Sequence, residues 1–310
     1  MVNNSFKILS LDGGGSKGIY SLGILLEIEA KLGSPLVNHF DCFYGCSTGA
    51  IIAALLAQGR KVEDIKNIYL HSLPNMMKTI RIGKRTKILC EILKKEFGDK
   101  KFDSFNKFVC VVATAEDGKT PKLFKSHVAG AHGRKESFAP GFGYTIAEAL
   151  VASCAATPFF EKATFRTGES LVDGGFCLGN PTLFAIIDSL KAFQKKKEEI
   201  VIINVGTGNF PHRVTLPWLW SVVKHRQSAD ILTNLSLSHS NMAALVTMLL
   251  FDDMKILRVS EDFPDLKTNI VESDMKILEK LFSRGRASFG KKEKDFESML
   301  RLCKNENSDG

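Results

Sequence analysis

Ser47 lies in the pentapeptide Gly45-Cys46-Ser47-Thr48-Gly49, which fits the pattern Gly-x-Ser-x-Gly. A serine hydroxyl becomes an effective nucleophile when the backbone exposes it and a base accepts its proton. Glycines at both ends of the pentapeptide, Gly45 and Gly49, allow a tight turn that leaves Ser47 Oγ exposed at a helix N-terminus. The pattern predicts a nucleophile elbow, although an ordinary turn rich in Gly and Ser gives the same letters.

A second glycine-rich stretch, residues 12–18, reads Asp-Gly-Gly-Gly-Ser-Lys-Gly. The amides of Gly13, Gly14 and Gly15 could hold an oxyanion if this loop lay beside a nucleophile. The glycines also fit the dinucleotide fingerprint Gly-x-Gly-x-x-Gly, which would indicate an oxidoreductase. In that class the next strand ends in an acid that binds ribose, whereas here it leads to Ser47.

A third motif, Asp173-Gly174-Gly175, follows a short apolar run. The two glycines remove side-chain bulk around the Asp173 carboxylate and allow a neighbouring turn to approach it. None of the seven histidines lies in a recognisable turn at a strand end, so we expect them to be structural or at the surface. The three motifs together predict a Ser–Asp dyad in which Asp173 accepts the Ser47 proton directly.

The elements around these motifs alternate between strand and helix patterns. Expected strands at residues 6–11 and 40–44 precede the glycine loop and the elbow, and apolar helical runs follow at residues 19–30 and 50–57. Two such units in succession predict an α/β fold with a mainly parallel sheet and helices on both faces. We expect one domain over residues 6–300, with a core at 6–210 and a helical part at 211–300. Residues 1–5 should be disordered, and residues 301–310 should form a charged tail.

Composition narrows the cellular setting. The 310 residues carry a formal charge of +8, which suits nucleic acid, an anionic membrane surface or solubility alone. Seven cysteines without a C-x-x-C pair argue against a disulfide framework and a zinc knuckle. The N-terminus lacks a signal-peptide pattern, and no apolar stretch is long enough to cross a bilayer. We therefore expect a cytoplasmic protein that touches membranes peripherally.

The three motifs, in this order and spacing, make the sequence similar to the patatin-like phospholipases. Softer matches to that family occur at residues 153–160, 180–181 and 205–208, and the resemblance covers residues 6–210. It implies a lipid acyl hydrolase with a three-layer α/β/α core that works without metal or cofactor. Ser47 would form an acyl-enzyme, Asp173 would act as the general base, and Gly13, Gly14 and Gly15 would supply the oxyanion hole.

The remaining motif residues would support this site by their backbone geometry or charge. Lys17 matches the basic position of the family and would provide electrostatics for phosphate or oxyanion, or pair with a carboxylate such as Asp12. The supporting glycines are Gly18, Gly45, Gly49, Gly174 and Gly175.

The expected partner is a membrane phospholipid, with no role for nucleic acid. Contact with the bilayer could come from Trp218 and Trp220, which have basic neighbours, or from the basic stretch at residues 75–101. A solvated helix face is the simpler interpretation of that basic stretch. The chain is also similar to bacterial antiviral effectors of this family, some of which respond to cyclic nucleotides, so we expect a regulatory small ligand or a homo-oligomer. A catalytically idle lipid-binding or regulatory module on the same fold remains the alternative to an enzyme.

Overall fold

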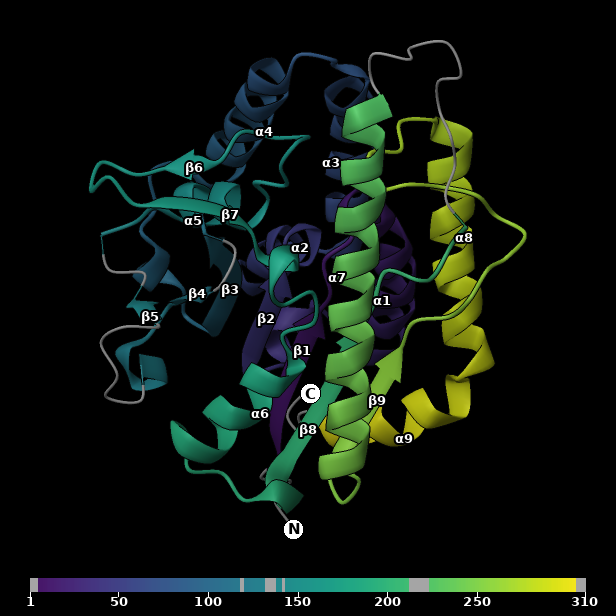
Figure 1. Ribbon diagram of the computed structural model, residues 1–310. Coiled ribbons are helices and arrows are strands. Elements are labelled where there is room, and N and C mark those ends of the chain that lie inside the picture. Colours follow the sequence, from purple (N-terminus) through teal and green to yellow (C-terminus); the bar gives the residue numbers. More distant parts are fainter. Residues whose placement is uncertain (1–4, 118–119, 132–137, 141–142, 212–222, 305–310) are drawn as a thin grey trace.

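The computed structural model describes residues 5–117, 120–131, 138–140, 143–211 and 223–304, and its centre is one β-sheet (Figure 1). The main path of the sheet runs β5-β4-β3-β2-β1-β8-β9. Strands β6 and β7 extend it, with β7 pairing to β3. Its strands are β1 (Phe6–Leu11), β2 (Cys42–Cys46), β3 (Phe108–Ala115), β4 (Pro121–Lys125), β5 (Phe138–Pro140), β6 (Ala163–Thr164), β7 (Ser170–Asp173), β8 (Ile200–Val205) and β9 (Lys255–Val259).

Most neighbouring strands are parallel, which confirms the predicted fold class. Strand β1 pairs in parallel with both β2 and β8, and β2 and β8 continue in parallel to β3 and β9. The antiparallel pairs are β3 with β4, β3 with β7 and β6 with β7. Parallel strands bring the loops at their carboxyl ends to one edge of the sheet, where ligand sites of α/β proteins usually lie.

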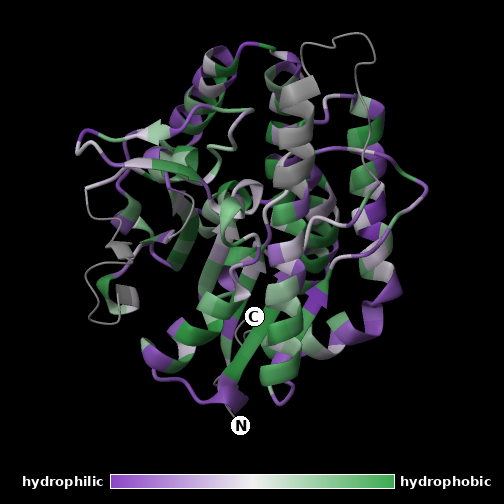
Figure 2. Ribbon diagram, in the orientation of Figure 1, coloured by the Kyte–Doolittle hydropathy of each residue, from purple (hydrophilic) through white to green (hydrophobic). Residues whose placement is uncertain are grey.

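Helices cover both faces of this sheet, and alternate strand residues face each layer. Leu9 and Phe43 pack in a large core with the helices of one layer, whereas Ile8 and Tyr44 pack in a smaller core that includes α6. Helix α7 contacts α6 and runs along the front of the sheet in Figure 1. The central strands are coloured hydrophobic in Figure 2, as burial on both faces requires. The helices are α1 (Gly18–Leu32), α2 (Thr48–Ala57), α3 (Val62–Lys78), α4 (Ile82–Phe97), α5 (Ile146–Ser153), α6 (Thr182–Lys191), α7 (Val223–Leu250), α8 (Met275–Lys291) and α9 (Glu293–Cys303).

The described C-terminal part of the chain is mainly helical and also contributes β9 to the sheet edge. Helix α8 lies directly against α1, where Tyr20 donates a hydrogen bond of 2.8 Å from its hydroxyl to Ser288 Oγ. Helix α9 continues three residues into the segment expected to be a tail and ends at the buried Cys303. Within the described ranges, every helix falls short of the length or the hydropathy needed to cross a bilayer.

Candidate active site

The predicted elbow forms between β2 and α2, with Ser47 as the single residue between them. Its φ of 50° and ψ of −121° are rare for a residue with a side chain. A Cβ on Gly45 would overlap the backbone of Ala50, and one on Gly49 would overlap the carbonyl oxygens of Leu11 and Asp12. Glycine is therefore required at both flanking positions for the chain to turn this sharply. The turn places Ser47 at the N-terminus of a ten-residue buried helix.

Asp173 reaches Ser47 because β3 lies between their two strands. Cys46, the last residue of β2, is in register with Val112 of β3, and Ala113 of β3 is in register with Asp173. Ser47 Oγ donates a hydrogen bond of 2.6 Å to Asp173 Oδ2. The distance is short enough for direct proton transfer without an intervening imidazole. Among the described residues no histidine is hydrogen-bonded to either member of this pair.

The Asp173 carboxyl group is buried and held in place by its own turn. The amide of Gly175 donates to Asp173 Oδ1 at 2.7 Å, and Thr114 Oγ1 donates to the Asp173 carbonyl at 2.9 Å. Burial raises the pKa of Asp173 from 3.8 to about 6, against the opposing effect of the hydrogen bonds from Ser47 and Gly175. A carboxylate with such a pKa is a stronger base than an exposed aspartate and still ionised at neutral pH.

The glycine loop after β1 lies beside the elbow, but its amides differ in their partners. Gly13 N–H already donates to the Gly179 carbonyl at 2.9 Å. Within the described part of the chain, the amides of Gly14 and Gly15 have no hydrogen-bond acceptor. Both glycines line the same cavity as Ser47, so two amides without an acceptor belong to the loop beside its hydroxyl.

Lys17 also lines this cavity, and its charge is almost completely removed from solvent. Burial lowers the pKa of Lys17 from 10.5 to about 8. The sequence predicted Asp12 as one candidate partner of Lys17. Asp12 is paired with Arg258 instead, with 2.8 Å between Arg258 Nη2 and Asp12 Oδ2. No carboxylate of the described residues forms an ion pair with Lys17, and its electrostatic role stays a prediction.

The cavity at Ser47 is narrow and apolar, with a volume of about 100 Å³. Its walls come mainly from α3, α4 and the segment after α5, in a pattern suited to a hydrocarbon chain. These wall residues were not predicted from the sequence, because the many basic side chains of residues 75–101 make the apolar helix face hard to recognise. The aliphatic and aromatic members of the wall are Ile51, Ile68, Tyr69, Leu73, Met76, Met77, Leu89, Ile92, Leu93, Ala156, Phe159, Phe160, Leu237, Ile270 and Val271.

Ser153 is a further site residue that was not predicted from the sequence. Its hydroxyl accepts the Ser47 amide at 2.9 Å and donates to the Val112 carbonyl at 2.5 Å. It therefore ties the elbow backbone to β3. The soft family match at residues 153–160 was the available signal.

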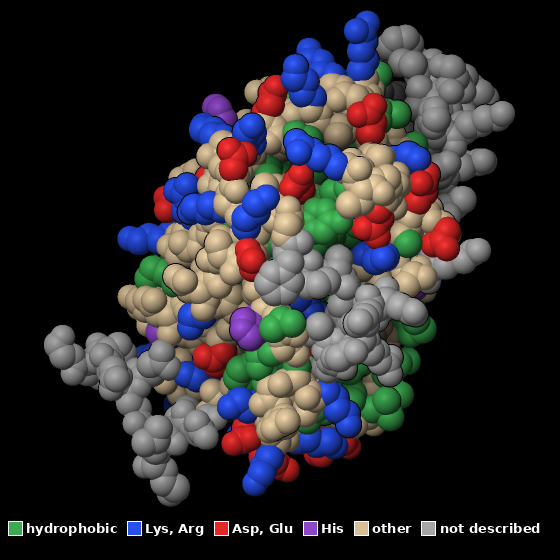
Figure 3. All heavy atoms as spheres, turned by 90° about the vertical axis from the view of Figure 1, so that its left-hand side faces the viewer, with side chains coloured by type: hydrophobic (Ala, Val, Ile, Leu, Met, Phe, Trp, Pro, Cys, Tyr) green, Lys and Arg blue, Asp and Glu red, His purple; other side chains and the backbone are tan. Residues whose placement is uncertain are grey.

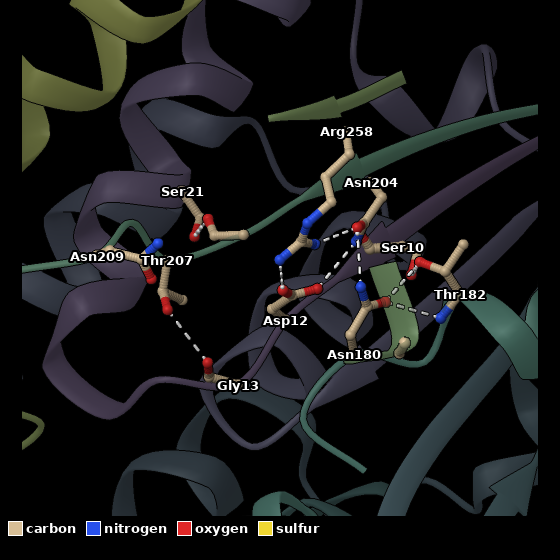
Figure 4. A network of polar contacts seen from close by, with 12 residues as sticks. Ser10, Asp12, Gly13, Ser21, Asn180, Thr182, Asn204, Thr207, Asn209 and Arg258 are labelled. Atoms are coloured by element: carbon tan, nitrogen blue, oxygen red, sulfur yellow. Dashed lines mark hydrogen bonds and ion pairs between the residues drawn. The ribbon is translucent and has the colours of Figure 1, made fainter. Parts of the chain in front are cut away.

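A buried polar network lies behind the glycine loop (Figure 4). Asn204 Nδ2 donates to Asp12 Oδ1 at 2.9 Å, and Arg258 binds both Asp12 and Asn204 Oδ1. Asn180 Nδ2 extends the network by donating to Asn204 Oδ1 at 3.1 Å. Arg258, a residue of strand β9, thus holds the Asp12 carboxylate immediately before the glycine loop. The sequence did not predict this strand.

The structure bears only partly on two further expectations, the membrane contact through tryptophan side chains and the absence of a metal. Trp218 and Trp220 lie outside the described residues, so their proposed membrane contact stays a prediction. Across the ranges that the structure describes, no three His, Cys, Asp or Glu side chains are grouped closely enough to hold a metal ion.

An elbow serine bonded to a buried carboxylate, beside unsatisfied amides and an apolar cavity, has the components of a serine hydrolase site. Residues 9–186 match the model of the patatin-like phospholipase family. The chain is also 40% identical, over 96% of its length and 95% of the relative's, to the cUMP-AMP-activated phospholipase of Escherichia coli. The chain therefore belongs to the patatin-like phospholipase family, a family of ester hydrolases, and the dinucleotide oxidoreductase alternative is set aside.

More distant relatives share part of this similarity. The cGAMP-activated phospholipase of Vibrio cholerae is 25% identical over 66% of this chain and 65% of its own. The 85/88 kDa calcium-independent phospholipase A2 of Rattus norvegicus is 28% identical over 66% of this chain, which corresponds to only 27% of that protein. Among solved structures, VipD from Legionella pneumophila aligns with a TM-score of 0.48 and 14% identity, covering 96% of this chain and 67% of VipD.

Proposed function

We propose that this protein hydrolyses fatty-acyl esters of membrane glycerolipids through an acyl-enzyme on Ser47, with Asp173 as the general base. The observation that carries the proposal is the hydrogen bond of 2.6 Å between Ser47 Oγ and Asp173 Oδ2 at the end of an apolar cavity. The family supports phospholipase activity, and the cavity lining favours an acyl chain over a polar substrate.

The geometry suggests a two-step reaction in which one carboxylate moves the proton twice. Ser47 Oγ attacks the ester carbonyl carbon while its proton passes to Asp173 Oδ2. The amides of Gly14 and Gly15 stabilise the oxyanion, each contributing on the order of 3 kcal/mol to barrier lowering. The lysolipid alkoxide leaves with the proton from Asp173. Water then attacks the acyl-enzyme, gives its proton to Asp173, and the fatty acid departs as Ser47 recovers the proton.

Lipid mass spectrometry tests this proposal directly. Phospholipid vesicles are incubated with the wild type, Ser47→Ala or Asp173→Asn, and released fatty acids and lysolipids are quantified. We expect each substitution to lower the rate by at least 10³-fold, since removing a nucleophile or its base has effects of this order. Ser283→Ala, an exposed serine on α8, is the matched control and should retain wild-type rates. Equal release by Ser47→Ala and the wild type would contradict the role of Ser47, and no release by either would favour the catalytically idle module.

Regulation by a cyclic dinucleotide is the second part of the proposal. It is supported by the full-length similarity to a relative named for activation by cUMP-AMP, and by weaker similarity to relatives named for activation by cGAMP. We expect cUMP-AMP to raise fatty-acid release by the wild type at least tenfold, with cGAMP as the comparison ligand. Equal fatty-acid release with and without either nucleotide would contradict this regulation and would leave the proposed role of Ser47 unaffected.

Peripheral membrane contact is proposed for the turn between α3 and α4. Ile80 in this turn is 85% exposed, and residues 78–87 carry five Lys or Arg without an acidic residue. Lys and Arg side chains gather over this upper end of the molecule in Figure 3. Arg85 is buried and holds the turn by donating to the Thr79 carbonyl at 2.6 Å. An exposed apolar tip among cations suits an anionic bilayer, and the adjacent Met76 and Met77 line the acyl cavity.

Vesicle co-sedimentation tests this contact. Ile80→Asp should weaken binding to vesicles with anionic lipid severalfold and leave hydrolysis of a soluble short-chain ester unchanged. Ile187→Asp on α6, an exposed isoleucine at the other end of the molecule, is the matched control. Equal binding by both variants and the wild type would place the membrane contact elsewhere.

A further inference from the structure

A second cavity lies on the opposite side of the polar network from the glycine loop. It has a volume of about 490 Å³ and is bounded by α6, α7, β8 and β9. That volume falls within the range of roughly 300–1,000 Å³ typical of small-molecule sites. The lining consists of Asn180, Thr182, Asn204, Ala244, Leu245, Thr247, Met248, Phe251, Asp252, Met254, Ile256 and Arg258.

The floor of this cavity is polar, and its side chains are hydrogen-bonded to one another. Asn180, Thr182 and Asn204 are buried, and Asn180 Oδ1 accepts both the amide and the hydroxyl of Thr182, at 2.9 and 2.6 Å. Arg258 reaches the floor from β9 and remains partly exposed. Its contacts with Asp12 and Asn204 use one N–H from each terminal nitrogen, so within the described chain its other donors remain for a ligand. A guanidinium in such a position suits a phosphodiester.

The wall of the cavity is apolar and faces solvent. Leu245 and Met248 of α7 are 52% and 62% exposed, and Phe251 follows them at the end of the helix. An aromatic ring such as that of Phe251 next to hydrogen-bonding amides is a combination that binds nucleobases, through stacking on one side and polar edge contacts on the other. The acidic Asp252 at the rim adds an acceptor for a base amino or ribose hydroxyl group.

Three connections join this cavity to the active site. Arg258 holds Asp12, which immediately precedes the glycine loop. Asn180 follows Gly179, whose carbonyl accepts the amide of Gly13. Helix α7 lines the second cavity near Leu245 and the acyl cavity at Ser236 and Leu237.

We infer that this second cavity is the binding site of the activating cyclic dinucleotide, with Arg258 on a phosphodiester and the α7 side chains on a base. The inference rests on the proposed activation by such a ligand and adds where the ligand acts. Ligand contact with Arg258 and Asn180 favours one position of the glycine loop, and contact with α7 favours one width of the acyl cavity. A ligand that binds one arrangement better shifts the population toward it, which is the physical basis of activation.

Calorimetric titration of cUMP-AMP into the full chain tests the location. Ala244→Phe places a ring in the cavity, whereas Asn241→Phe adds the same ring on an exposed position of α7 that does not line it. We expect Ala244→Phe to weaken cUMP-AMP binding at least 100-fold and to abolish stimulated hydrolysis, while Asn241→Phe matches the wild type. Wild-type affinity in a folded Ala244→Phe variant overturns the inference.

Hydrogen–deuterium exchange of the wild type gives a second readout that does not depend on a variant folding. Added cUMP-AMP should protect amides at residues 178–182 and 244–258. Protection confined to other segments overturns the location and leaves ligand activation standing. Failure of both cUMP-AMP and cGAMP to bind the wild type overturns the site and the activation together, whereas Ser47-dependent hydrolysis is judged separately by the lipid assay.

Discussion

Ser47 Oγ and Asp173 Oδ2 lie 2.6 Å apart although their strands, β2 and β7, do not pair with each other. Strand β3 lies between them and pairs in parallel with β2 and antiparallel with β7. Because the register places Val112 opposite Cys46 and Ala113 opposite Asp173, the two side chains meet at one edge of the sheet. The position of the proposed base is thus determined by backbone pairing rather than by a flexible loop.

The pH dependence of hydrolysis should report the buried carboxyl group. Asp173 has to be ionised to accept the Ser47 proton, and burial raises its pKa to about 6. We therefore expect kcat/KM for a soluble short-chain ester to rise with pH through about 6 and then level off. A profile measured in the absence of membranes isolates this group, and a flat profile between pH 5 and 8 would contradict its role as base.

Asp173→Asn should stabilise the fold while it removes activity. The pKa of Asp173 is higher in the folded chain than the 3.8 of the free group, so the folded state loses stability as pH rises through about 6. A shift of this size corresponds to a cost on the order of 3 kcal/mol at neutral pH. We expect the variant to melt several degrees higher at pH 7.5, with the difference shrinking toward pH 4. A lower melting temperature at pH 7.5 would show that the carboxylate stabilises the fold instead.

The sequence predicted the parts of this site that depend on backbone chemistry. Gly45 and Gly49 flank a turn that only glycine permits, and Asp173 follows a short apolar run, so the motifs carry local signals. Strand β9 was not predicted because Lys255–Val259 includes two cations, and its parallel pairing to β8 is a tertiary contact. The acyl cavity was missed for a similar reason: Leu89 and Leu93 face it from a helix whose other faces are basic.

The sequence also could not show that the amides of the three loop glycines differ in their hydrogen-bond partners. Gly13, Gly14 and Gly15 are equivalent in a motif, and only the contact with Gly179 distinguishes the first of them. That contact joins residues far apart in the chain, so no local pattern encodes it.

Close approach at the elbow makes Gly49 intolerant of a side chain. A Cβ there would overlap the carbonyl oxygens of Leu11 and Asp12 and force α2 away from the glycine loop. We expect Gly49→Ala to lower esterase activity at least 100-fold, because displacing the nucleophile by about 1 Å can have such an effect. Gly290→Ala, at an open position near the end of α8, is the matched control and should leave activity unchanged. Similar activity in the two variants would show that the elbow tolerates the displacement.

A buried ion pair fastens α6 beneath the sheet. Lys125 Nζ lies 2.7 Å from Asp188 Oδ1, and Tyr44 donates to Asp188 Oδ2 at 2.9 Å. Removing one partner leaves a buried charge without its counterion, so Asp188→Ala should lower the free energy of unfolding by about 3–5 kcal/mol in urea titrations. Glu116→Ala, which breaks the exposed pair of Glu116 with Lys162, should cost less than about 1 kcal/mol. Equal losses in the two variants would contradict this account of α6.

The direct transfer of the Ser47 proton to Asp173 is tested most directly by the rate of fluorophosphonate labelling, with the adduct located by peptide mass spectrometry. We predict a single adduct on Ser47 in the wild type, formed at least 100-fold more slowly in Asp173→Asn and at the wild-type rate in Asp103→Asn, an exposed aspartate. Labelling of Ser47 in Asp173→Asn at the wild-type rate, or an adduct on another residue, would contradict the Ser47–Asp173 dyad.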